Sequence, residues 1–252
     1  MIKIILHGCM GNLSKAIRKL IENHESYEIV CGVDVVGSGN GLTFPIYSDI
    51  SLCDQKADVI IDCSVVEAVP TLLTFAVKKQ IPVVLCTTGL PKELLEDVAK
   101  ASQKVAILQS PNMSIGVNLL INLVQRAAKL LDGFDVEIIE KHHKLKVDAP
   151  SGTALALADA VNKSLDGQME YVYDRSKERK KRDNKEIGIH ALRGGTIVGD
   201  HSVVFAGIDE VIEFKHQALS KEVFAVGALR AAEFINGRQA GFYTMQDLMD
   251  EG

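Results

Sequence analysis

Titratable and cationic side chains are concentrated between residues 137 and 154, in the segment Glu-Ile-Ile-Glu-Lys-His-His-Lys-Leu-Lys-Val-Asp-Ala-Pro-Ser-Gly-Thr-Ala. This segment combines the adjacent histidines His142 and His143 with lysines that include Lys146. Histidine exchanges protons near neutral pH, and a lysine becomes an acid when burial lowers its pKa. The cationic side chains would also neutralise an anion. The combination predicts a site that binds an anionic small molecule and protonates it during reaction.

A turn that suits an anion follows these residues. Pro150 blocks an earlier helix, and the apolar spacing from Thr153 onward predicts a helix that Ser151 or Thr153 can cap. A helix N-terminus offers backbone N–H donors and the positive end of the helix dipole, which favour a carboxylate or a phosphate. We therefore expect Ser151, Gly152 and Thr153 to bind an anionic group of the ligand.

Two other interpretations of the histidine pair are weaker. Such a pair often ends a strand without any chemical role, but the Pro-Ser-Gly-Thr turn at this spacing favours a site. A metal site made of His142, His143 and Asp148 is disfavoured, because adjacent strand residues point to opposite faces and the nearby lysines repel a cation. The sequence therefore predicts no metal.

The N-terminus contains a second pattern with chemical meaning. An apolar strand over residues 2–6 leads into the turn His-Gly-Cys-Met-Gly-Asn-Leu-Ser, then a helix, then a strand over 28–33 that ends at Asp34. This order is typical of a dinucleotide-binding unit, in which the acid holds the ribose hydroxyls of NAD. Ser14 replaces the third glycine and is small enough to keep the helix close to the strand. The thiol of Cys9 is expected to face the cofactor.

Strands and helices then alternate along the first half of the chain. Strands are predicted at 58–62, 82–86 and 105–108, with helices over 66–78 and from 91 onward. This alternation predicts a doubly wound parallel sheet that binds ligands beyond the carboxyl ends of its strands. We expect four groups of residues to gather at that edge: Gly8 to Leu13, Asp34, Thr87 with Thr88, and Asn112.

The pattern changes from residue 114 onward. A long helix over 115–131 precedes the histidine segment, and three strands follow with few helices between them, at 187–192, 202–206 and 210–215. This region predicts an open sheet of mixed or largely antiparallel pairing. An amphipathic helix over 221–235 is then expected to return to the first domain.

The sequence as a whole predicts an α/β protein with two domains. Residues 1–113 and 221–252 are expected to form a Rossmann-type dinucleotide-binding domain with a parallel sheet. Residues 114–220 are expected to form a smaller α+β domain that binds substrate and mediates oligomerisation.

Composition excludes several classes of function. The net charge of −5 disfavours a nucleic-acid partner, and acids flank the basic run at 179–182, which predicts a solvated loop. No apolar run is long enough for a membrane span or a signal peptide, which predicts a cytoplasmic protein without a membrane partner. The five cysteines lack Cys-x-x-Cys spacing, which argues against a zinc site or a disulfide framework.

These segments together resemble the 4-hydroxy-tetrahydrodipicolinate reductases, also called dihydrodipicolinate reductases, of bacterial lysine and diaminopimelate synthesis. The resemblance covers nearly the whole chain and includes Thr-Thr-Gly at 87–89, Pro-Asn-Met-Ser-Ile-Gly-Val-Asn at 111–118 and Arg-Gly-Gly-Thr-Ile-Val-Gly-Asp-His at 193–201. It implies NAD(P)H-dependent reduction of a cyclic dicarboxylate imine to tetrahydrodipicolinate, with hydride from the nicotinamide and a proton from the protein. It also implies a homotetramer built through the second domain.

The resemblance assigns roles to individual residues. His142 is implied as the proton donor or relay. His143 and Lys146 are implied as substrate-binding residues, with Lys146 also supplying the proton, and Gly152 and Thr153 as the turn that binds a substrate carboxylate. The implied cofactor contacts are Gly8, Cys9, Met10, Gly11, Asn12, Leu13, Asp34, Cys86, Thr87, Thr88, Ser110, Pro111, Asn112 and Met113.

The chain departs from the family at positions that bear on the cofactor. The family usually carries a basic residue where Asn12 stands. A basic side chain there, or just after Asp34, would help to accept the 2′-phosphate of NADP, but Val35 and Val36 follow that acid. We predict that NADH is preferred and that NADPH is the poorer cofactor.

Two other classes of function fit part of the sequence. A different nicotinamide-dependent imino- or amino-acid dehydrogenase would share the first domain without needing the 142–153 segment. A non-catalytic dinucleotide sensor would bind NADH without turnover and would need neither His142 nor Lys146.

Overall fold

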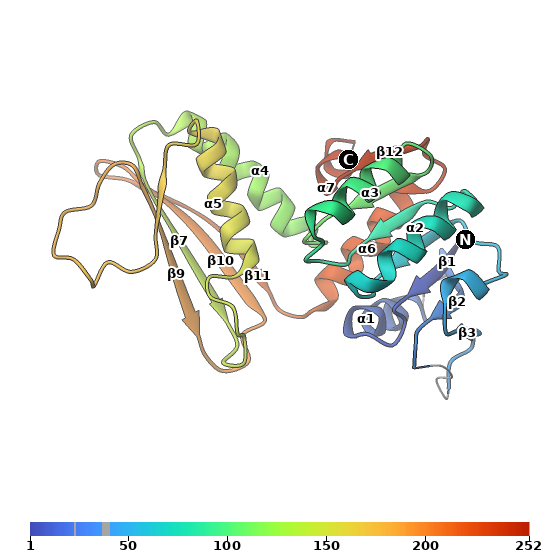
Figure 1. Cartoon of the computed structure of the whole chain (residues 1–252). Coiled ribbons are helices and arrows are strands. Elements are labelled where there is room, and N and C mark those ends of the chain that lie inside the picture. Colours follow the sequence, from blue (N-terminus) through green and yellow to red (C-terminus); the bar gives the residue numbers. More distant parts are fainter. Residues whose placement is uncertain (23, 37–40, 252) are drawn as a thin grey trace. The chain divides into compact units, whose positions relative to one another are not determined.

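The chain folds into two compact units, of which the computed structural model describes residues 1–22, 24–36 and 41–251 (Figure 1). Unit 1 comprises Met1–Ile115 and Lys221–Gly252, and unit 2 comprises Gly116–Ser220. The first division falls after residue 115, where the sequence analysis placed it after residue 113. Within the described ranges, no helix is both long and apolar enough to cross a membrane.

Unit 1 is built on a seven-stranded sheet, sheet A. Its strands are β1 (Ile2–His7), β2 (Tyr27–Val33), β3 (Ile46–Tyr47), β4 (Val59–Asp62), β5 (Val83–Leu85), β6 (Ala106–Gln109) and β12 (Gly241–Tyr243). They lie in the order β12-β6-β5-β4-β1-β2-β3, and all neighbouring pairs are parallel. The strand order reverses at β1, which confirms the predicted doubly wound fold. Ligands of such sheets bind at the carboxyl ends of the strands beside this point.

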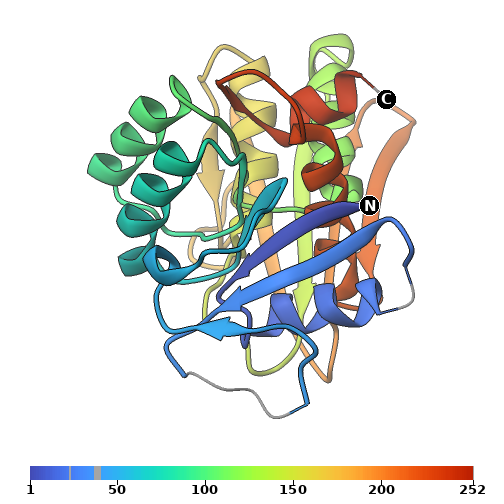
Figure 2. The ribbon, with the colours of Figure 1, turned by 90° about the vertical axis from the view of Figure 1, so that its right-hand side faces the viewer.

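Helices cover both faces of sheet A (Figure 2). On one face, α1 (Asn12–Ile21) and α6 (Glu222–Ile235) pack over a core that includes Ile4, Leu6 and Ile61. On the other face, α2 (Val69–Lys79) and α3 (Lys92–Ser102) pack over a second core. The strands are thus buried on both sides, which explains why they are continuous apolar runs instead of alternating ones.

The end of the chain completes unit 1. Helix α6 approaches the segment after β6 closely, because a Cβ on Gly227 would lie 1.6 Å from the carbonyl oxygen of Met113. Strand β12 extends the sheet beside β6, and the short helix α7 (Met245–Asp250) follows it with a capping box formed by Thr244 and Asp247. The sequence analysis predicted α6 but not β3, β12 or α7.

Unit 2 contains a five-stranded sheet, sheet B. Its strands are β7 (Asp135–His142), β8 (Glu170–Val172), β9 (Glu186–Arg193), β10 (Gly199–Ala206) and β11 (Val211–Ala218), in the order β11-β10-β7-β9-β8. Strand β10 is antiparallel to β7 and β11, whereas β7, β9 and β8 run parallel, which confirms the predicted mixed sheet. Helices α4 (Ile115–Leu130) and α5 (Gly152–Ser164) lie on one side of it (Figure 1) and share its apolar core.

Strand β7 aligns polar residues with this core. Its side chains alternate between buried and partly exposed, so that Glu140 and His142 follow Val136 and Ile138 on the buried face. The register of the neighbouring strands places Arg193 of β9 beside His142. These pairings assemble the polar cluster at the end of β7.

Candidate functional site

A buried carboxylate organises the cluster in unit 2. Glu140 is fully buried, and its Oε2 accepts a hydrogen bond from His142 Nδ1 at 2.7 Å. The two terminal nitrogens of Arg193 donate to the two carboxylate oxygens at 2.7 and 2.8 Å, and the backbone N–H of Ser151 donates to Oε1 at 3.0 Å. Burial alone would raise the pKa of Glu140, but the hydrogen bonds from Arg193, His142 and Ser151 outweigh it and lower that pKa. Glu140 is therefore an anion at neutral pH.

Glu140 fixes the orientation of His142. A carboxylate only accepts hydrogen bonds, so Nδ1 of His142 carries a hydrogen and Nε2 remains for another partner. Gly199 lies against this atom, because a Cβ there would be 3.1 Å from Nε2. The ring is thus held in one orientation and can receive or deliver a proton at Nε2.

A second buried histidine lies beside the first. The rings of His142 and His201 are edge to face, with centroids 5.2 Å apart. His201 Nε2 lies 3.0 Å from Ser151 Oγ. Burial, reinforced by the nearby His142, lowers the pKa of His201 from 6.5 to about 4. His201 is therefore neutral at neutral pH.

The expected role of Ser151 changes with this geometry. Its Oγ accepts the N–H of Ala154 at 3.2 Å and contacts His201, while its own N–H donates to Glu140. Both polar groups of Ser151 are used inside the protein, and the residue is buried. The structure therefore assigns Ser151 to capping α5 and positioning the turn, in place of the direct contact with an anion that we expected.

The loop after β7 carries the remaining predicted substrate residues. Lys146 Nζ donates to Asp148 Oδ1 at 2.8 Å, and this hydrogen bond lowers the pKa of Asp148. The charge of Lys146 contributes to the low pKa of His201, which places the amine within electrostatic reach of that ring. His143 Nδ1 is buried and lacks a hydrogen-bond partner among the described residues. A ligand oxygen would satisfy it.

Helix α5 begins directly after this loop. Gly152 and Thr153 are its first residues, and the space around the Cα of Gly152 is open. A helix of 13 residues has a developed dipole, so its N-terminus favours an anion. The structure thus brings the predicted anion turn next to Glu140 and His142 through Ser151.

In unit 1, the glycine turn after β1 has the shape expected of a pyrophosphate-binding loop. Gly8 has a φ of +72°, and a Cβ there would lie 2.5 Å from the carbonyl oxygen of Cys63. At Gly11 a Cβ would lie 3.3 Å from the Gly8 oxygen. Ser14 is fully buried and donates to that same oxygen at 2.8 Å, which explains how serine replaces the third glycine.

Asp34 directly follows β2 and hydrogen-bonds the glycine turn. Its Oδ2 accepts the N–H of Met10 at 3.0 Å, and its Oδ1 accepts the N–H of Val36 at 3.2 Å. Asn12 is exposed at the start of α1, whereas Leu13 packs against the core below. The turn and the acid therefore form one preorganised unit, as a dinucleotide site requires.

The expected contact between the Cys9 thiol and the cofactor is wrong. Cys9 is fully buried, and its Sγ lies 2.6 Å from where a Cβ on Gly32 would stand. Burial, followed by the charge of Asp34, raises the pKa of Cys9 to about 11. The thiol is directed into the core because glycine at position 32 leaves room for it, so only the main chain of Cys9 faces the turn.

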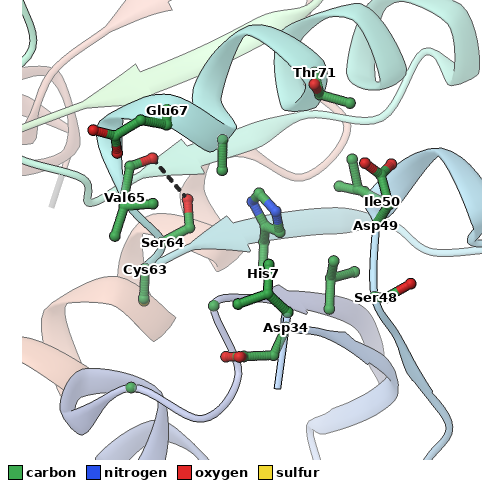
Figure 3. Close-up of a pocket in the computed structure, with 15 residues that line it drawn as sticks. His7, Asp34, Ser48, Asp49, Ile50, Cys63, Ser64, Val65, Glu67 and Thr71 are labelled. Carbon is green, nitrogen blue, oxygen red and sulfur yellow. Dashed lines mark hydrogen bonds between the residues drawn. The ribbon is translucent and has the colours of Figure 1, made fainter. Parts of the chain in front are cut away.

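A cavity of about 430 Å³ opens at the carboxyl ends of β1, β2 and β4. Figure 3 shows His7 in its centre, with Asp34, Ser64 and Asp49 around it. The lining residues are His7, Gly8, Gly11, Val33, Asp34, Val35, Ser48, Asp49, Ile50, Cys63, Ser64, Val65, Glu67, Ala68 and Thr71. Among the described residues, this lining includes three carboxylates and no lysine or arginine. Of the predicted cofactor residues, the cavity gathers Gly8, Gly11 and Asp34.

A second group of predicted cofactor residues follows β5 and β6 at the same edge of sheet A. Thr87 is buried and Thr88 exposed after β5, whereas Cys86 lies in the core. After β6, Pro111 is exposed, and Ser110 Oγ donates to the carbonyl oxygen of Asn112 at 2.8 Å. The side chain of Met113 lies in the core.

A buried aspartate joins three strands near the cavity. Asp62 is fully buried at the end of β4, and His7 Nδ1 lies 2.7 Å from its Oδ1. Ser64 Oγ donates to Oδ1 at 2.6 Å, and Thr87 Oγ1 donates to Oδ2 at 2.6 Å. One carboxylate therefore fixes the ends of β1, β4 and β5 relative to one another.

Sequence reasoning missed five of these residues: His7, Asp62, Glu140, Arg193 and His201. Glu140 had a signal, because it lies two positions before His142 in a strand and so shares its face. Among the described residues, no group of three or more His, Cys, Asp or Glu side chains could hold a metal ion.

Comparison with protein families gives matches over nearly the whole chain. Residues 2–113 match the family described as "Dihydrodipicolinate reductase, N-terminus", and residues 116–249 match "Dihydrodipicolinate reductase, C-terminus". A "4-hydroxy-tetrahydrodipicolinate reductase" from Caldanaerobacter subterraneus subsp. tengcongensis is 52% identical over 252 residues, which cover 100% of both chains. Another from Clostridium novyi is 47% identical over 251 residues, covering 99% of this chain and 98% of the relative.

Solved structures show the same fold. A dipicolinate-bound dihydrodipicolinate reductase from Paenisporosarcina sp. superposes with a TM-score of 0.82 at 21% identity, covering 97% of each chain. An amine dehydrogenase from Mycobacterium smegmatis gives a TM-score of 0.64 at 8% identity, covering 97% of this chain and 95% of the other. At these identities the similarity concerns architecture alone.

Proposed function

The chain belongs to the dihydrodipicolinate reductase family, and we propose that residues 142–153 bind and protonate the substrate of its reaction. The chain reduces 4-hydroxy-tetrahydrodipicolinate, in the route to diaminopimelate and lysine, with a reduced nicotinamide dinucleotide as cofactor. The connection from Glu140 to both His142 and the start of α5 carries the proposal, because one anion orients the proton-bearing ring and the anion-binding turn together.

The substrate, a cyclic imine with two carboxylates, is proposed to bind through its negative charges. One carboxylate accepts hydrogen bonds at the N-terminus of α5, from Gly152 and Thr153. His143 and Lys146 bind the remaining charge, and Lys146 exchanges Asp148 for the substrate. Cationic groups here also stabilise charge that develops in the transition state.

His142 and Lys146 are the two groups proposed to deliver the proton. The bound reduced nicotinamide supplies the hydride. Glu140 stabilises the protonated ring of His142. Arg193 pairs with Glu140, so the buried carboxylate is not left without a cationic partner. His142 Nε2 is then the atom from which the proton leaves, with Lys146 as the second donor.

A coupled assay tests the proposal. Substrate is generated from pyruvate and aspartate semialdehyde by the preceding synthase, and loss of NADH absorbance is followed with wild type, Lys146→Ala and His142→Asn. General acid catalysis predicts a loss of about 10²-fold or more in kcat for a proton donor. The exposed neighbour Lys144 gives the matched control, Lys144→Ala, which should retain activity. Full activity in both Lys146→Ala and His142→Asn would rule the proposed roles out.

NADH is proposed as the preferred cofactor. The cavity beside Asp34 carries the carboxylates of Asp34, Asp49 and Glu67, and its described lining residues include no lysine or arginine. A 2′-phosphate would add negative charge beside these acids without an arginine to pair with it. The acidic lining agrees with the sequence-based prediction, in which the lack of a basic side chain at Asn12 and Val35 disfavours NADPH.

Steady-state kinetics with both cofactors measures this preference. We expect kcat/KM for NADH to exceed that for NADPH by about tenfold, which corresponds to about 1.4 kcal/mol. Val35→Arg should shift the ratio towards NADPH, and Val35→Leu is its uncharged control. Equal or higher kcat/KM with NADPH in wild type would refute the preference.

The assembly is proposed to be a homotetramer formed through unit 2, in the cytoplasm. Helices α4 and α5 lie on one side of sheet B, and Leu192, Ile208 and Val211 are exposed large apolar residues of this unit. Burial of such residues between copies would stabilise the sheet. Light scattering should give four times the mass of 27.4 kDa, and a stable monomer would contradict this. Cell fractionation tests the location.

A further inference from the structure

We propose that His7 is a cofactor-binding residue that hydrogen-bonds the adenosine half of the dinucleotide through Nε2. The inference rests on the proposed function only in assuming that the dinucleotide enters the unit 1 cavity. It adds a contact at the end of β1, between the glycine turn and Asp34, that neither the glycine pattern nor the acid supplies.

The ring of His7 is built into the cavity. His7 is the last residue of β1 and directly precedes Gly8, and its side chain is 7% exposed and lines the cavity (Figure 3). Nδ1 is 2.7 Å from Asp62 Oδ1, and Asp62 is itself fully buried and held by Ser64 and Thr87. The ring therefore cannot turn without breaking a buried hydrogen bond, and its remaining polar atom is Nε2.

The bond to Asp62 sets the chemistry of Nε2. Because a carboxylate only accepts, the hydrogen of the neutral ring lies on Nδ1, and Nε2 is an acceptor. In the described part of the chain, no protein group hydrogen-bonds Nε2 of His7. An acceptor facing a cavity is matched by a ligand that brings a donor.

The other lining residues favour adenosine as that ligand. Val33, Ile50 and Val65 provide apolar surface for a flat base, and Asp34 and Asp49 add further acceptors. Adenosine combines an apolar ring with ribose hydroxyl and amine donors, and it carries no negative charge of its own. A phosphate offers no donor and would meet these acids unfavourably. The donors of adenosine thus match the acceptors of the cavity.

The substitution His7→Asn separates a binding role from a structural one. The amide nitrogen of asparagine stands near the position of Nδ1, so the variant keeps the hydrogen bond to Asp62 and loses only Nε2. The exposed histidine of the same unit provides the control, His24→Asn. Calorimetric titration of each protein with ADP-ribose measures binding of the adenosine half without any nicotinamide.

We expect the Kd for ADP-ribose to rise about 3- to 10-fold in His7→Asn, as for loss of one hydrogen bond, and to be unchanged in His24→Asn. The KM for NADH should rise by a similar factor while kcat at saturating NADH stays the same. Thermal unfolding of His7→Asn should match wild type. A Kd for ADP-ribose within twofold of wild type in His7→Asn would overturn the proposal.

Failure of the proposed function gives a different result. In that case wild type would bind ADP-ribose, with weaker binding in His7→Asn, but would not reduce the imine. Such an outcome would support the role of His7 and contradict the catalytic role proposed for residues 142–153.

Discussion

Acid should destabilise unit 2 through the buried His201. This residue is 4% exposed, and burial with the nearby His142 lowers its pKa from 6.5 to about 4. Between these values the unfolded chain binds a proton that the native state does not, so stability falls as the pH decreases below about 6.5. The difference of about 2.5 between the two pKa values corresponds to about 3 kcal/mol of unfolding free energy. About 2 kcal/mol of this is lost when the pH falls to 5. At neutral pH this contribution to stability is intact.

The groups around His201 account for the size of this effect. Glu140 favours the charged ring, but His142, His216 and Lys146 oppose it together with burial. Protonation would also alter the contact with Ser151, whose hydroxyl caps α5. Burial and each of these charged neighbours except Glu140 therefore disfavour a proton on His201.

Urea unfolding at pH 7.5 and at pH 5 measures the contribution. The variant His201→Gln places an amide near Ser151 and removes the titrating group, and the exposed His24→Gln serves as control. We expect wild type and His24→Gln to lose about 2 kcal/mol more than His201→Gln between the two pH values. Other titrating groups are common to all three proteins and cancel in the comparison. An equal loss in all three would refute the reasoning.

Three further predictions follow from the described contacts. Glu140→Gln should lower kcat on the order of 10²-fold, because the neutral amide no longer supports a protonated His142; unchanged kcat in steady-state assays would contradict this. Gly8→Ala should destabilise the protein by about 2 kcal/mol more than Gly237→Ala, since both have positive φ but only Gly8 has a Cβ clash. Thermal unfolding of the two variants compares them, and equal midpoints would exclude the clash. Cys9 should resist alkylation by iodoacetamide in the native protein and react after unfolding, because it is buried with a pKa near 11; mass spectrometry showing rapid native modification would oppose that placement.

Much of the fold was predictable because local patterns were strong. The apolar runs of β1 and β4 are buried on both faces, and such strands need no long-range information to be recognised. The turn after β1 and the turn before α5 were also predictable, because glycine, proline and serine limit the local backbone. Strands β3 and β12, of two and three residues, were missed because they exist only through pairing with β2 and β6.

The polar partners of the site were less accessible to sequence reasoning. Arg193 and His201 lie more than fifty positions after Glu140 in the sequence. The register of sheet B is what brings Arg193 to Glu140 and His201 to Ser151. The pair formed by His7 and Asp62 likewise depends on β1 and β4 being neighbours. The strand order of a doubly wound sheet implies that these strands are adjacent, but it does not say which of their side chains meet. Cys9 was misplaced because a turn position does not reveal which way its side chain points.

The completion of sheet A by residues near the end of the chain has a consequence for biosynthesis. Unit 2 is inserted into unit 1, so a ribosome makes Gly116–Ser220 before it makes α6 and β12. Until then, Ala106–Gln109 is an edge strand and the face that α6 covers is open. Unit 2 has its own contiguous core and is able to form first during translation. Nascent chains that stop before residue 222 would thus leave the dinucleotide unit unfinished, and such chains are natural clients for chaperones that shield exposed apolar surface.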